Sequence, residues 1–160
     1  MKEVKIESTL YVFESIGELP KEAAFLMQKA FEARDKAYAP YSNFNVGTAI
    51  LLDNGEIITG NNQENASYPS GLCAERTAIY YAGSQYPDAK VVRMAISATS
   101  KNKPTLNPIP PCGACRQAIA EYEIKQESPI EIYFMGETGK VAKSTSLANL
   151  LPLVFDKSVL

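Results

Sequence analysis

Three cysteines and one glutamate form the most reactive grouping in this sequence. Cys112 and Cys115 make a C-x-x-C pair, and Cys73 lies upstream with Glu75 two positions beyond it. Thiolates with this spacing bind zinc, take part in thiol–disulfide exchange or form a disulfide. The chain contains no histidine. Every mechanism that requires an imidazole is therefore excluded.

Three interpretations of the cysteines compete. A disulfide leaves one cysteine unpaired, and a thioredoxin-like redox pair gives no role to Cys73 or Glu75. Zinc uses all three thiolates, but a structural zinc site normally takes four protein ligands, and the chain has no fourth cysteine. An open fourth position is typical of catalytic zinc, which lowers the pKa of a bound water to about 7. The cysteine count therefore favours a catalytic zinc ion.

Such a site needs a proton carrier and a source of positive charge. Glu75 lies at a predicted helix start, so its carboxylate could reach the reacting water without being a ligand. Three thiolates leave the zinc site with a net negative charge, which weakens the metal as an electrophile. Helix N-termini at Cys73 and at the C-x-x-C pair favour thiolate. Arg76 is expected to donate to the Cys73 sulfur and so compensate its charge, and Arg116 and Gln117 could act similarly.

Length and composition indicate one globular domain. The chain has 160 residues, of which 46% are hydrophobic and 21% charged, so it can bury a core unaided. No apolar stretch approaches the roughly 20 residues of a transmembrane helix, and the first residues lack the apolar centre of a secretory signal. The cytoplasm is therefore the expected location. A net charge of -2 argues against a nucleic acid polymer as a partner.

Hydrophobic periodicity predicts alternating helices and strands. The expected helices are residues 20–36, 73–82, 112–122 and 146–151, and the expected strands are residues 46–52, 56–59, 91–98, 130–135 and 140–142. Residues 4–13 alternate weakly, as at a sheet edge. We therefore expect an α/β fold, a three-layer α/β/α sandwich around a mixed sheet of about five strands. Residues 21–160 form the single domain, and residues 1–20 precede it as an extension with a possible edge strand.

The motifs resemble those of a known family. Cys73–Ala78 and Pro111–Gln117 resemble the zinc-binding elements of the cytidine deaminases, in the small three-cysteine form usually found as homotetramers. Ala33–Gly47 and Asn62–Pro69 resemble other signature stretches of the same family. The resemblance covers about Gln28 to Phe155.

The resemblance implies a reaction and its catalytic groups. One Zn²⁺ per chain would be held by Cys73, Cys112 and Cys115, and Glu75 would carry the proton from the attacking water to the pyrimidine and then to the leaving amine. Cytidine and 2′-deoxycytidine would become uridine and 2′-deoxyuridine, with release of ammonia. The implied biological role is pyrimidine salvage.

The resemblance also implies how a small nucleoside is bound. Asn62 and Glu64 would bind the ribose hydroxyls. The backbone of Ala74 would bind the base, and Phe44 would flank it. Without the resemblance, Asn62 and Glu64 are interpreted as residues of a solvated loop, and Phe44 is interpreted as a core residue.

Two further aromatic residues are implied to act between subunits. Phe155 would stack on the base in a neighbouring subunit's site, and Tyr68 would reach a neighbouring site as well. The expected partners are therefore further copies of the chain in a homotetramer, with no membrane partner.

Other functions remain as alternatives. Residues 101–110 make a long, proline-rich approach to the cysteine pair and could alter access to the pocket. The enzyme could therefore deaminate another aminopyrimidine nucleoside, such as blasticidin S. A non-catalytic zinc-stabilised binding module is also possible if Glu75 is a fourth ligand.

Overall fold

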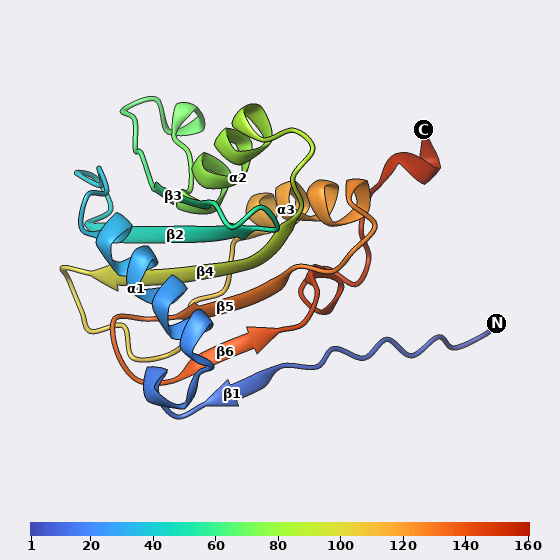
Figure 1. The fold of residues 1–160 in the computed structure, drawn as a ribbon, viewed down its shortest axis with the longest axis horizontal. Coiled ribbons are helices and arrows are strands. Elements are labelled where there is room, and N and C mark those ends of the chain that lie inside the picture. Colours follow the sequence, from blue (N-terminus) through green and yellow to red (C-terminus); the bar gives the residue numbers. More distant parts are fainter.

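The structure, a computed structural model that describes residues 1–160, is a mixed sheet with helices on both faces (Figure 1). The helices are α1 (Lys21–Arg34), α2 (Ala74–Gln85) and α3 (Gly113–Lys125), and the strands are β1 (Tyr11–Phe13), β2 (Phe44–Leu52), β3 (Ile57–Asn61), β4 (Val91–Ser100), β5 (Glu131–Met135) and β6 (Val141–Ser144). None of the helices combines the length and apolar character needed to cross a membrane. The predicted α/β class is confirmed.

The sheet has six strands in the order β1-β6-β5-β4-β2-β3, one more than the approximate prediction. The additional strand is β1, which pairs antiparallel with β6 and is much shorter than the segment expected from residues 4–13. Its length is limited because β6 itself offers only four residues for pairing. Only β4 and β5 pair in parallel, with α3 as the crossover between them.

Alternation along β2 divides the interior into two layers. Ala49 packs in a cluster with α1, whereas Ile50 and Leu52 belong to a larger cluster that includes residues of α2 and α3. Figure 1 shows α1 crossing one face of the sheet and α2 and α3 lying on the other. The predicted three-layer α/β/α arrangement is therefore confirmed.

Two glycines let helices approach the sheet closely. A Cβ at Gly47 would lie 2.1 Å from the Ala30 carbonyl oxygen of α1, and one at Gly60 would lie 2.7 Å from the Ala74 carbonyl oxygen of α2. A larger residue at either position would collide with helix backbone. Gly60 thereby fixes the start of α2 against β3.

The prediction of a helix over residues 146–151 is wrong. Only Leu147–Asn149 forms a single 3₁₀ turn, capped by the Ser146 hydroxyl, which accepts from the Ala148 amide. Pro152 follows directly after Leu151, and a proline disfavours helical conformation in the residue before it. The remaining stretch is too short for an α-helix.

The sheet topology brings the N-termini of α2 and α3 to the same end of the strands. Strands β3 and β4 each pair antiparallel with β2, so they run in the same direction. The next helix after β3 is α2, and the next after β4 is α3. The residues that begin these two helices are therefore neighbours, although they are distant in sequence.

Candidate active site

The three cysteine sulfurs meet where α2 and α3 begin. Cys73 precedes the first residue of α2, Cys112 precedes that of α3, and Cys115 lies in the first turn of α3. The Cys73 sulfur lies 3.7 Å from that of Cys112, which lies 3.5 Å from that of Cys115. All three sulfurs fall within 4.8 Å of one another, and all three thiols are free. The disulfide interpretation is therefore not supported.

These separations fit one tetrahedral zinc ion. Zinc–sulfur bonds of about 2.3 Å place two tetrahedral sulfur ligands about 3.8 Å apart. The ligand group consists of the three cysteines alone. A zinc ion held here keeps one coordination position for a non-protein ligand, which is the arrangement of catalytic zinc.

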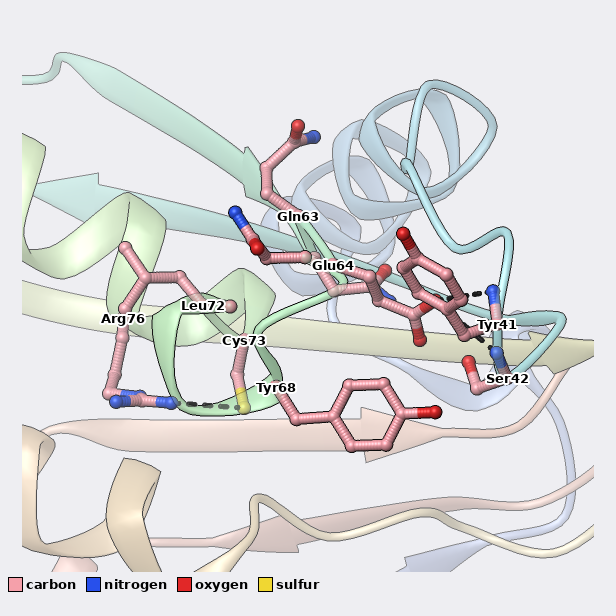
Figure 2. A pocket seen from close by; sticks show the side chains of 11 residues that line it. Tyr41, Ser42, Gln63, Glu64, Tyr68, Leu72, Cys73 and Arg76 are labelled. Carbon is pink, nitrogen blue, oxygen red and sulfur yellow. Dashed lines mark hydrogen bonds between the residues drawn. The ribbon is translucent and has the colours of Figure 1, made fainter.

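Arg76 compensates the negative charge at Cys73. Its Nη2 atom donates to the Cys73 sulfur over 3.6 Å, as Figure 2 shows. A hydrogen bond with Cys115 and the Arg76 guanidinium lower the pKa of Cys73 to about 5, against the opposing effect of burial. Cys73 is therefore a thiolate at neutral pH, ready to bind a cation.

Cys115 is a weaker acid than Cys73 in this cluster. Its hydrogen bond to the Cys73 sulfur and its burial raise the pKa of Cys115 above the ordinary range, and the nearby charge of Glu75 adds to this effect. Thiolate ligands release their protons when a metal binds. A divalent cation in the cluster would therefore displace the proton of Cys115.

Glu75 is a buried carboxyl beside the cluster. It lies in the first turn of α2 and only 4% of its surface is exposed. Burial raises the pKa of Glu75, and the charge of the neighbouring Cys73 thiolate raises it further. A buried carboxyl with a raised pKa, close to thiol ligands, suits proton transfer near neutral pH.

A cavity of about 450 Å³ opens beside Cys73. Its volume is in the range of pockets that hold small ligands. Its lining consists of Tyr41, Ser42, Asn62, Gln63, Glu64, Asn65, Tyr68, Gly71, Leu72, Cys73 and Arg76. Figure 2 shows Glu64 and Tyr68 on the side of the cavity toward Tyr41, with Cys73 and Arg76 at the opposite side.

The two polar residues expected at the ribose already have protein partners. Asn62 donates through Nδ2 to the Phe44 carbonyl and accepts at Oδ1 from the Val46 amide, at 2.9 and 2.8 Å. Glu64 accepts at Oε2 from the amides of Tyr41 and Ser42, at 2.9 and 3.2 Å. Burial of the half-exposed Glu64 carboxyl acts to raise its pKa, but the hydrogen bonds from Ser42 and Tyr41 outweigh this effect and lower the pKa. It is therefore an anion that organises this side of the pocket.

The structure does not bring every predicted contact into this cavity. Asn62, Glu64 and Tyr68 line it, but Phe44, Ala74 and Phe155 do not. Ala74 is fully buried, whereas 63% of the surface of Phe155 is exposed.

Sequence reasoning missed the role of the Tyr41–Ser42 backbone, which holds Glu64. The adjacent Ala39-Pro40-Tyr41-Ser42 stretch has the composition of a turn, but nothing local in it indicates a carboxylate partner more than twenty residues away.

The expectation that Arg116 and Gln117 compensate thiolate charge is wrong. Arg116 donates to the carbonyls of Pro111 and Leu150, each over 2.8 Å. Gln117 donates to the Phe155 carbonyl, also over 2.8 Å. These side chains point to backbone acceptors because the C-terminal segment passes along α3, and they anchor that segment near the cysteine cluster.

Comparisons with known proteins agree with this geometry. The family described as "Cytidine and deoxycytidylate deaminase zinc-binding region" matches residues 20–128. The cytidine deaminase of Halalkalibacterium halodurans is 42% identical over 81% of this chain and 91% of its own length, and that of Sporosarcina psychrophila is 39% identical over 82% and 90%. The crystal structure of cytidine deaminase from Burkholderia pseudomallei is similar with a TM-score of 0.70 and 36% identity, over 86% of this chain and 100% of that one.

The chain therefore belongs to the cytidine deaminase family. It is a zinc-dependent hydrolytic deaminase, and its three-cysteine cluster is consistent with one zinc ion per chain.

Replacing Cys112 tests the metal centre. We expect Cys112→Ala to abolish stoichiometric zinc and to lower the free energy of unfolding by on the order of 4 kcal/mol, because metal binding contributes directly to folding. Elemental analysis and denaturant unfolding measure the two effects. Wild-type protein stripped by a chelator serves as the control and should match the stability of the variant. One zinc per chain in the variant would contradict the site.

Proposed function

We propose that this enzyme hydrolyses cytidine and 2′-deoxycytidine to the corresponding uridines and ammonia, in cytoplasmic salvage of pyrimidines. One observation carries the proposal: three thiolate ligands at two helix N-termini lie beside a buried glutamate and a nucleoside-sized pocket. The free cysteines suit a reducing compartment. The relatives' names support cytidine as the substrate.

The chain's own residues carry the protons in the proposed reaction. Zinc, when bound, supplies Lewis acidity that activates the attacking water at neutral pH. Glu75 accepts a proton from this water and delivers it to N3 of the pyrimidine as the water oxygen attacks C4. Glu75 then takes the remaining proton of the attacking oxygen and transfers it to the amino group at C4, so that the C4–N bond breaks, ammonia leaves, the C4 carbonyl forms and N3 keeps its proton. Its burial supports this role because a raised carboxyl pKa brings acid and base forms closer to balance near neutral pH.

The cavity provides the groups for the sugar. Asn62 and Glu64 bind the ribose hydroxyls in this proposal, with Glu64 held in place by the Tyr41 and Ser42 amides. The backbone of Ala74 binds the base, and Phe44, at the beginning of β2, flanks it. Asn62 and Glu64 need not contact the 2′ position of the sugar, so both nucleosides are substrates in this proposal.

The proposed assembly is a homotetramer whose subunits complete one another's sites. The support is the exposure of two aromatic side chains near the pocket and along the C-terminal segment. Tyr68 is 75% exposed and Phe155 is 63% exposed. The Gln117 side chain donates to the Phe155 carbonyl, so the backbone is held in place while the ring faces solvent. Aromatic rings of this kind are typical anchors between protein surfaces.

Shortening Phe155 tests the shared site. We expect Phe155→Ala to raise KM for cytidine by about fivefold, because a lost aromatic stacking contact is worth roughly 1 kcal/mol. Val159→Ala is the matched control, since this residue is also exposed on the C-terminal segment. Light scattering should give a tetramer for wild-type protein. A fully active monomer would contradict the proposal.

Replacing Glu75 tests the proton carrier. We expect Glu75→Gln to lower kcat for cytidine by about 10² to 10⁴, because general acid–base catalysis contributes a factor of this size. Zinc content and thermal stability should be retained, since the amide keeps the shape of the side chain. Glu56→Gln, at an exposed carboxyl in the β2–β3 turn, is the control.

The same variant separates catalysis from a purely structural zinc module. If Glu75 were a zinc ligand, Glu75→Gln would lose metal and unfold. Retained zinc together with retained turnover would instead contradict the proton-carrier role.

A further inference from the structure

The hydroxyl of Thr48 stands apart from the other buried hydroxyl groups. Thr48 is completely buried in β2, and its Oγ1 has no hydrogen bond partner in the protein. The buried hydroxyls of Ser97, Thr105 and Ser144 each donate to a backbone carbonyl, over 3.1, 3.0 and 2.6 Å. Nearly all buried polar side chains are paired, because leaving one unpaired is costly. The Thr48 hydroxyl therefore calls for a functional explanation.

Strand register places Thr48 beneath the beginning of α2. Thr48 lies directly opposite Gly60 of β3, and side chains of opposed residues in an antiparallel pair project from the same face. A Cβ at Gly60 would lie 2.7 Å from both the Ala74 carbonyl oxygen and the Ala78 amide nitrogen. The Thr48 side chain therefore projects toward the first turn of α2.

The same helix turn directs Glu75 toward β2. Ala74 and Ala78 lie over β3, which is the last strand of the sheet, so one side of α2 faces solvent and the other faces β2. Glu75 and Ile79, one helical turn apart, are both buried and therefore lie on the β2 side. Ile79 shares its core cluster with Ile50, the next β2 residue after Thr48 on this face. Glu75 therefore lies on the side of α2 that faces the strand carrying both Thr48 and Ile50.

We propose that Thr48 is a positioning residue whose hydroxyl hydrogen-bonds the carboxyl of Glu75 through one buried water. A hydroxyl both donates and accepts. A bridge of this kind would limit rotation of the Glu75 carboxyl and hold it toward the reacting atoms. The inference rests on the proposed function of Glu75.

Removing only the hydroxyl tests the proposal. We expect Thr48→Val to lower kcat for cytidine about tenfold, because a hydrogen bond to a charged group is worth roughly the free energy of one decade in rate. KM should stay within about twofold, because the ribose contacts lie elsewhere, and zinc should remain at one per chain. Thr48→Ser should retain most of kcat. Thr59→Val, on β3 and facing the opposite side of the sheet, is the control.

Stability separates this role from a merely unsatisfied hydroxyl. A merely unsatisfied hydroxyl would make Thr48→Val more stable than wild type and leave kcat unchanged, whereas a hydroxyl that holds Glu75 would lower kcat without a gain in melting temperature. A lower kcat in an equally stable, zinc-loaded variant supports the proposal. An unchanged kcat in such a variant overturns it.

A second pair of variants covers the case in which valine does not fold. Thr48→Ser and Thr48→Ala differ by one oxygen, and the serine variant should then have the higher kcat by about tenfold. Equal kcat values for serine and alanine would overturn the proposal. Wild-type protein that does not deaminate cytidine would instead contradict the proposed function, so the two failures are distinguishable.

Discussion

The structure depends on the convergence of two helix N-termini on three sulfur atoms. Strands β3 and β4 run in the same direction, so α2 and α3 begin at the same edge of the sheet. Their unpaired amides and positive dipole ends favour thiolate, and Arg76 adds a full positive charge at Cys73. The free energy of zinc binding therefore also stabilises the contact between the two helix N-termini.

The two carboxyl groups at the site, those of Glu75 and Glu64, differ in burial and therefore in pKa. Glu75 is buried in the first turn of α2 beside the cysteine cluster, where desolvation raises the pKa of its carboxyl. Glu64 is only half-buried at the cavity, where backbone amides keep it ionised. One carboxyl is thus suited to moving protons and the other to binding hydroxyl groups, although both belong to the same short region of the chain.

Much of the fold and metal centre could be predicted because their signals are local. The cysteine spacing, the missing histidine and the alternating periodicity indicated the zinc ligands and the layers. The helix predicted near Leu151 does not form, because the following proline disfavours helical backbone despite the apolar residues. The prediction for Arg116 was wrong because its carbonyl acceptor at Leu150 is distant in sequence. The position of the unpaired Thr48 hydroxyl beneath α2 follows from the pairing of Thr48 with Gly60 of β3. Strand pairing of this kind cannot be deduced from a local sequence pattern.

The most direct test of the account is ammonia release from cytidine by purified protein, before and after zinc is removed by a chelator. Adenosine and cytidine 5′-monophosphate serve as comparison substrates. The account predicts turnover of cytidine, loss of that turnover on chelation and its return when zinc is restored. Folded, zinc-loaded protein that releases no ammonia from cytidine or 2′-deoxycytidine would contradict it.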